Sequence, residues 1–209
     1  MKPLTLTIGI VAAVALAGCA GSASAPASSP EVTMSAPSST PAPSSTPAPS
    51  ADSTAFVVTS PDFVDGGELD EKFTADAFGG QCVGDNISPA LEWRHAPEGT
   101  VTFAIAMTDE SANGWVHWLH ADIPASVTSV AQGASGDLPG VAGRDQAKGL
   151  PQYFGPCPPG PDHRYVFTVY ALDAELGLEE GFSGTDLVIA MKDHVLAAAA
   201  ITGVRSGPA

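Results

Sequence analysis

The chain has 209 residues, and its 23 acidic side chains outnumber its 8 basic ones, which gives a formal net charge of −15 at pH 7. Hydrophobic residues make up 44% of the sequence, enough for a globular core. A surface this acidic repels phosphate backbones and argues against nucleic acid as a partner. Its simplest role is to keep the protein soluble and away from anionic lipid.

Residues 1–18 have the features of a bacterial lipoprotein signal peptide. Lys2 precedes an apolar run from Leu4 to Leu16, which is short for a membrane span. The run ends in Leu16-Ala17-Gly18-Cys19, which resembles a lipobox. We predict that Cys19 is lipidated and becomes the N-terminus, anchored on the extracytoplasmic face of the bacterial cell membrane. The alternative is an ordinary secretory peptide with an incidental cysteine.

We predict that residues 19–54 form a disordered tether, because after Cys19 they consist mainly of Ala, Ser, Pro and Thr. At about 3 Å per residue, its roughly 35 residues reach on the order of 100 Å when fully extended. Such tracts are also common sites of O-glycosylation.

Residues 55–205 have the size of one domain, followed by a short tail, residues 206–209. This domain carries 21 acidic and 7 basic side chains, a formal charge of −14. Short alternating segments separated by Gly and Pro turns predict a mainly β fold, an antiparallel β-sandwich of two sheets with Greek-key connections. We expect strands over residues 55–58, 91–93, 101–109, 115–123 and 163–170, and one short C-terminal helix over 183–192 behind a Ser183 cap. Residues 194–204 fit either a helix or a final strand.

Two cysteines remain once Cys19 is assigned to lipid. Because the compartment is oxidising, we predict a disulfide between Cys82 and Cys157. It would join the two loops that hold these residues. A metal site is the alternative, although no Cys-x-x-Cys or neighbouring His supports it.

Polar side chains with possible chemistry lie on three of the predicted strands. Asp109 ends a strand whose core face is otherwise apolar. In the next strand, strict alternation places His117 with Leu119 and His120 with Trp118, so only one histidine can face a given pocket. Each of these residues, taken alone, could equally have a purely structural role, either in a turn or as a hydrogen-bonded residue at the edge of the core.

A rigid loop precedes the fifth predicted strand. Four prolines lie between Pro156 and Pro161, and the strand that follows carries His163 and Tyr165 on the same face. The loop therefore delivers an imidazole and a phenol to the end of an apolar sheet face.

Together these segments resemble the signatures of the phosphatidylethanolamine-binding protein family, in particular its bacterial Raf-kinase-inhibitor-like branch. The resemblance rests on Asn86-Ile87-Ser88-Pro89-Ala90-Leu91-Glu92-Trp93, Asp109, His117-Trp118, and Gly155-Pro156-Cys157-Pro158-Pro159-Gly160 followed by His163-Arg164-Tyr165. It implies a β-sandwich with a small cavity at one end that binds anions such as phosphate, acetate or a phosphoethanolamine head group.

The resemblance also implies which residues bind the ligand: Asp109, His117, Gly155, Pro156, His163 and Tyr165. The chain departs from the family pattern at residues 109–113, which read Asp-Glu-Ser-Ala-Asn where the family commonly has Asp-Pro-Asp-Ala-Pro. We expect this wall of the cavity to be looser and its ligand preference altered.

These features favour a membrane-anchored binding protein that needs no cofactor or metal. The alternative is an inhibitor or regulator of an extracytoplasmic enzyme, such as a protease or a kinase-receptor domain. Hydrolysis is disfavoured, because no Ser, Cys or metal-binding triad accompanies the histidines. In an acidic domain, short-range donors must bind the anion: His117 or His163, the Tyr165 hydroxyl, and backbone N–H groups near Gly155. Asp109 is expected to hold one imidazole.

We expect phosphate binding to weaken as the pH rises through about 6 to 8, because a charged imidazolium donor is lost in this range. Isothermal titration calorimetry measures the dissociation constant directly. An affinity that stays constant from about pH 5 to 8.5 would contradict the imidazolium mechanism.

Overall fold

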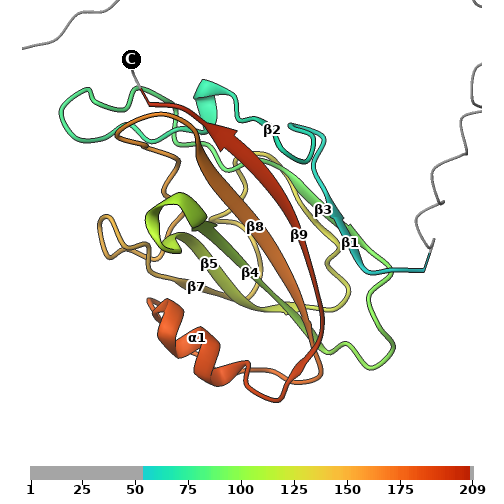
Figure 1. The fold of residues 1–209 in the computed structure, drawn as a ribbon. Helices are drawn as coiled ribbons and strands as arrows, with labels where there is room; N and C mark the ends of the chain where they lie inside the picture. Colours follow the sequence, from blue (N-terminus) through green and yellow to red (C-terminus); the bar gives the residue numbers. More distant parts are fainter. Residues whose placement is uncertain (1–53, 208–209) are drawn as a thin grey trace, which may run out of the picture. The chain divides into compact units, whose positions relative to one another are not determined.

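The computed structural model describes residues 54–207, which form two β-sheets and one α-helix (Figure 1). The predicted signal peptide, lipidated Cys19 and nearly all of the tether lie outside the described residues. Between residues 54 and 207, no helix is long and apolar enough to cross a membrane.

Six strands form the larger sheet in the order β2-β9-β8-β4-β5-β7. Its pairs run antiparallel, as predicted, except that β2 and β9 run parallel. Its long strands are β4 (Thr102–Asp109), β5 (Trp115–Pro124), β8 (His163–Leu172) and β9 (Val195–Arg205), and its short edge strands are β2 (Gly67–Glu68) and β7 (Val141–Gly143).

Three short strands form the second sheet, in the order β1 (Val57–Thr59), β3 (Leu91–Arg94) and β6 (Ser129–Val130). In β3, Leu91 and Trp93 are buried and alternate with exposed residues, as expected for a strand with one core face. Trp93 meets Phe103 of the larger sheet edge to face, with ring centroids 5.5 Å apart. The core therefore lies between the two sheets, and the predicted β-sandwich is confirmed.

The helix α1 (Gly184–Ala190) packs on the outer face of the larger sheet. Ser183 caps it as predicted: its hydroxyl accepts a hydrogen bond from the backbone of Asp186, whose carboxylate accepts one from the backbone of Ser183. Leu187 is the buried residue of the helix and belongs to the same apolar cluster as Leu119 of β5.

The segment that the sequence left undecided, residues 194–204, forms most of strand β9. It contains four consecutive alanines, 197–200, which favour a helix in isolation. Pairing along β8 supplies backbone hydrogen bonds to this run, so tertiary context overrides local propensity.

A disulfide joins Cys82 to Cys157, with Cα atoms 5.6 Å apart, as predicted. Cys82 closes a turn through its backbone bridge with Ala77. Cys157 lies in the proline-rich loop before β8, by which we mean residues 153–161. Two loops separated by 75 residues are thereby held against each other.

Replacing both cysteines by serine should lower the free energy of unfolding by about 4 kcal/mol, because the unfolded chain loses a long covalent loop. Urea unfolding of the double variant and of the oxidised wild type measures the difference. An unchanged unfolding midpoint would mean that the cross-link contributes nothing to stability.

Candidate functional site

The ends of three neighbouring strands bring the predicted polar residues together. Asp109 is the last residue of β4, and the sheet register pairs it with Trp115 at the start of β5 and with Tyr165 near the start of β8. His163, the first residue of β8, lies two positions before Tyr165, and their rings stack with centroids 6.4 Å apart. Residues more than 50 positions apart thus share one end of the sheet.

Asp109 orients His163. One carboxylate oxygen, Oδ2, lies 2.6 Å from His163 Nδ1, and the other accepts hydrogen bonds from the backbone of Ser111 and Ala112. Both oxygens therefore have partners within the protein, and Asp109 holds an imidazole as the sequence led us to expect. His163 Nε2 makes no hydrogen bond within the described part of the chain and remains available to a ligand.

The segment that departs from the family pattern forms a short 3₁₀ helix, η2 (Glu110–Ala112), with Asp109 as its N-cap. It ends at Asn113, whose φ of 56° is in the left-handed region that proline cannot adopt. Ser111 also accepts a hydrogen bond from the backbone of Arg164. The wall is thus a capped turn tied to β8, and its effect on ligand preference remains a prediction.

A β-bulge turns His117 toward the same cavity. Met107 pairs with Trp118 but Thr108 pairs with Val116, so His117 is the extra residue of β5. Its ring meets that of Tyr165 edge to face at 5.2 Å, whereas Leu119 packs on the outer face of the sheet. The prediction that His117 shares a face with Leu119 is wrong, because strict alternation does not hold across a bulge.

His117 is bonded to the proline-rich loop in both directions. Its Nδ1 lies 2.8 Å from the carbonyl oxygen of Phe154, and the Phe154 N–H donates to the His117 carbonyl at 3.0 Å. The two rings also stack at 6.1 Å. Burial lowers the pKa of His117 and outweighs the opposing effects of the Phe154 carbonyl and of Asp109. This histidine is therefore neutral at neutral pH.

Tyr165 presents a buried hydroxyl toward the predicted ligand-binding residues. Its side chain is fully buried, and its hydroxyl lies near the Asp109 carboxylate and the Cys157 backbone without making a hydrogen bond of normal geometry to any described residue. Burial raises the pKa of this phenol, and the nearby Asp109 carboxylate raises it further. The hydroxyl stays protonated at neutral pH and can donate a hydrogen bond to a ligand.

These four residues, Asp109, His117, His163 and Tyr165, line one cavity of about 260 Å³. Sequence reasoning missed several apolar residues that line the same cavity: Phe78, Trp115, Phe154 and Pro159. The sequence could have indicated Trp115 as a lining residue, since it lies two positions before His117 in the same predicted strand. Phe78 was not, because only the fold brings the Cys82 turn to this place. The residues Phe78 and Trp115 are 59% and 42% exposed, so they line the part of the cavity that is open to solvent.

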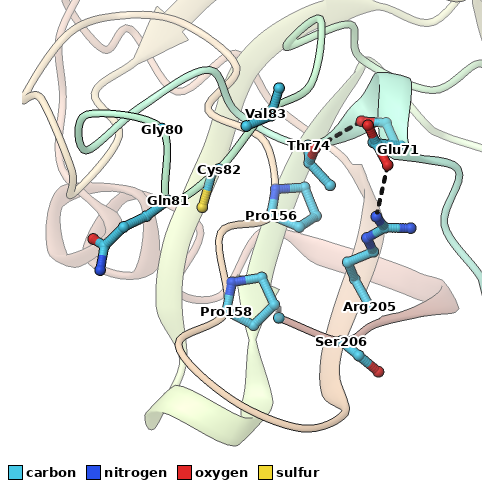
Figure 2. A pocket seen from close by; sticks show the side chains of 11 residues that line it. Glu71, Thr74, Gly80, Gln81, Cys82, Val83, Pro156, Pro158, Arg205 and Ser206 are labelled. Carbon is cyan, nitrogen blue, oxygen red and sulfur yellow. Dashed lines mark hydrogen bonds and ion pairs between the residues drawn. The ribbon is translucent and has the colours of Figure 1, made fainter. Parts of the chain in front are cut away.

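The structure places the other two predicted ligand residues, Gly155 and Pro156, outside this cavity. A Cβ on Gly155 would clash with the backbone carbonyl of Phe73, so the loop packs too closely there for any side chain. Pro156 lines a separate pocket of about 300 Å³ together with Cys82 and Arg205, as Figure 2 shows. Gly155 and Pro156 therefore serve to pack the proline-rich loop against its neighbours.

Asn86 has a role that the sequence did not reveal. Its side-chain oxygen accepts from the Gly155 N–H at 2.8 Å, and its side-chain amide donates to the Tyr153 carbonyl at 3.2 Å. One side chain from the Asn86–Trp93 stretch thus holds the proline-rich loop from the side opposite His117.

His120, the second histidine of β5, is buried away from the cavity. Its ring nitrogens make no hydrogen bond of normal geometry within residues 54–207, although the backbone of Leu138 and Pro139 lies nearby, and burial lowers its pKa. No group of three or more His, Cys, Asp or Glu residues in the described region could hold a metal ion.

Comparison with known proteins identifies the family and the fold. Residues 59–206 match the sequence profile of the phosphatidylethanolamine-binding proteins. The chain belongs to this family. The crystal structure of Escherichia coli YbcL, described as a member of the mammalian family, has a TM-score of 0.67 and 32% identity, covering 73% of this chain and 99% of YbcL.

Two relatives within the family are similar over most of their length. UPF0098 protein YbhB of Escherichia coli is 37% identical over 156 residues, 70% of this chain and 98% of YbhB. LppC of Mycobacterium tuberculosis, which is named as a lipoprotein, is 31% identical over 209 residues, 96% of this chain and 94% of LppC. The match to LppC extends beyond the family domain toward the N-terminus.

The two buried histidines should make the fold sensitive to acid. Their pKa values are lowered in the folded protein, so below the ordinary value of 6.5 the unfolded chain takes up protons more readily. The free energy of unfolding should fall as the pH drops from 7.5 to 5, by at most about 1.4 kcal/mol per pH unit for each histidine.

Urea unfolding at several pH values measures this slope. The variant His120→Leu removes one of the two buried groups without touching the cavity, so its slope should be shallower than that of the wild type. An identical slope would show that His120 does not contribute.

Proposed function

We propose that this family member is an extracytoplasmic binding protein whose cavity holds a small anion, such as phosphate or a phosphorylated head group. The observation that carries the proposal is the buried Tyr165 hydroxyl, which has no hydrogen-bond partner among the described residues. A buried polar group without a partner costs about 1–3 kcal/mol, and a ligand atom in the cavity removes that cost.

The remaining geometry supports an anionic ligand. His163 is held through Nδ1, so when its ring carries two protons Nε2–H donates into the cavity with a positive charge. Asp109 balances that charge, and its own oxygens are occupied by His163 and by the η2 backbone. The domain charge of −14 opposes an approaching anion, so short-range hydrogen bonds must provide the affinity.

Binding without catalysis fits the residues that line the cavity. The sulfur of Cys157 is engaged in the disulfide, and no serine or free thiol is among the residues that line the cavity. The volume of about 260 Å³ is slightly below the usual range for drug-sized ligands, which favours a small ligand or the head group of a larger one.

The variant Tyr165→Phe should weaken phosphate binding about 5–20-fold, because it removes one hydrogen-bond donor from the cavity. It should leave the free energy of unfolding unchanged or slightly raised, because the deleted hydroxyl has no partner in the folded protein. Calorimetric titration with inorganic phosphate and urea unfolding measure the two effects separately.

The neighbouring phenol provides a matched control. The hydroxyl of Tyr153 donates to the Phe73 carbonyl at 2.9 Å, so Tyr153→Phe should cost stability and leave phosphate affinity nearly unchanged. If neither wild type nor variants bind phosphate at millimolar concentration, the proposed function is wrong.

A lipid anchor on Cys19 would place this cavity within reach of the membrane surface and of other cell-envelope molecules. The similarity to LppC along nearly its whole length supports this part of the proposal. The variant Cys19→Ser should move the protein from the membrane fraction to the soluble fraction, measured by cell fractionation and immunoblotting. Retention of the variant in the membrane would contradict the anchor.

A further inference from the structure

The hydrogen bond between His117 and the proline-rich loop determines which polar atom His117 offers to a ligand. A carbonyl oxygen only accepts, so the Nδ1 atom that lies 2.8 Å from the Phe154 carbonyl must carry the proton. In the neutral ring the other nitrogen, Nε2, is then an acceptor. The backbone of Gly155 also lies near the His117 ring, next to the Phe154 carbonyl, and the ring lines the cavity.

The cavity therefore offers both kinds of hydrogen-bonding group. Tyr165 provides a hydroxyl donor, and His117, with its proton on Nδ1, provides an acceptor at Nε2. We propose that the cavity selects anions that bring their own hydrogen-bond donor, which they place on His117 Nε2 while their charged oxygens accept from Tyr165 and His163. This inference rests on the proposed anion-binding function and narrows its class of ligand.

An anion without a proton is disfavoured by the same geometry. Sulfate at neutral pH has only acceptor oxygens, so one of them would face the lone pair of His117 Nε2 at close range. A phosphate that retains one proton has the same size and shape but donates that proton to Nε2. Sites that hydrogen-bond a ligand proton reject analogues that lack it, because a buried polar group is left unpaired.

The surroundings of His117 resist the alternative in which its ring becomes charged. The charged groups that act on it are Asp109 at the end of β4 and Asp145 in the loop after β7, and both favour a proton on the ring. Burial outweighs them and keeps the pKa of His117 low. Its two ring nitrogens therefore keep one donor and one acceptor role at neutral pH.

Two sources of ligand share this chemistry. A free phosphate or phosphate monoester carries a P–OH group until its last proton is lost, around pH 6 for a monoester. A lipid head group of the phosphoethanolamine type has no P–OH, but its ammonium group provides N–H donors. A choline head group carries a similar charge without an N–H, so it is the matched negative probe.

Calorimetric titration of the whole protein at pH 6 tests the inference with four probes: inorganic phosphate, sulfate, glycerophosphoethanolamine and glycerophosphocholine. We expect phosphate to bind at least about tenfold more tightly than sulfate. Equal binding of phosphate and sulfate would overturn the inference while leaving the proposed anion site intact. No binding of any probe would overturn the proposed function itself, and the inference with it.

The other two probes identify the source once phosphate is preferred over sulfate. Tighter binding of glycerophosphoethanolamine than of glycerophosphocholine would indicate a lipid head group as ligand. Equal or absent binding of these two would indicate a free phosphate or a monoester.

The variant His117→Gln tests the named atom. A glutamine amide can turn either its oxygen or its N–H toward a ligand. The ratio of the sulfate to the phosphate dissociation constant should therefore fall toward one. The matched control is His120→Gln, on the same strand but outside the cavity, which should keep the wild-type ratio. If His117→Gln does not fold, as judged by near-ultraviolet circular dichroism, the wild-type ratio of phosphate to sulfate decides the question alone.

Discussion

The paired hydrogen bonds between His117 and Phe154 connect the proline-rich loop to the central sheet. Because the loop donates to the strand and accepts from its side chain, neither part can shift without breaking both bonds. Asn86 holds the same loop from another side, and the disulfide at Cys157 secures it to a third segment. The cavity exists because three segments that are distant in the sequence, around His117, Asn86 and Cys82, keep one loop in one place.

The same bonds determine the electrostatics of the cavity. The Asp109 carboxylate accepts hydrogen bonds from His163 and from the η2 backbone. One ring nitrogen of His117 donates to the Phe154 carbonyl. What remains free is one phenolic donor, one imidazole acceptor and one imidazole nitrogen whose role depends on protonation. Such a set fits the proposed ligand, which both donates and accepts, within an acidic domain that attracts no anion at long range.

The outline of the fold was readable from local patterns. Alternation in residues 101–109 and 163–170 placed β4 and β8, and Ser183 with Asp186 marked the start of α1. Sequence patterns did not predict secondary structure where strand pairing outweighs helix propensity, as in the alanine run of β9. The two-residue strands β2 and β6 are too short to show any alternation, so only their partners define them.

The sequence by itself determined the family, the chemical identity of the cavity residues and the pairing of Cys82 with Cys157, because motif order and cysteine number depend on no coordinates. Tertiary structure decided how those residues are used. A single extra residue in β5 turns His117 away from Leu119 and toward Tyr165, and the proline-rich loop packs so that Gly155 and Pro156 are not among the residues that line the cavity. Register shifts and interatomic clearances arise only when distant strands meet, so no local pattern records them.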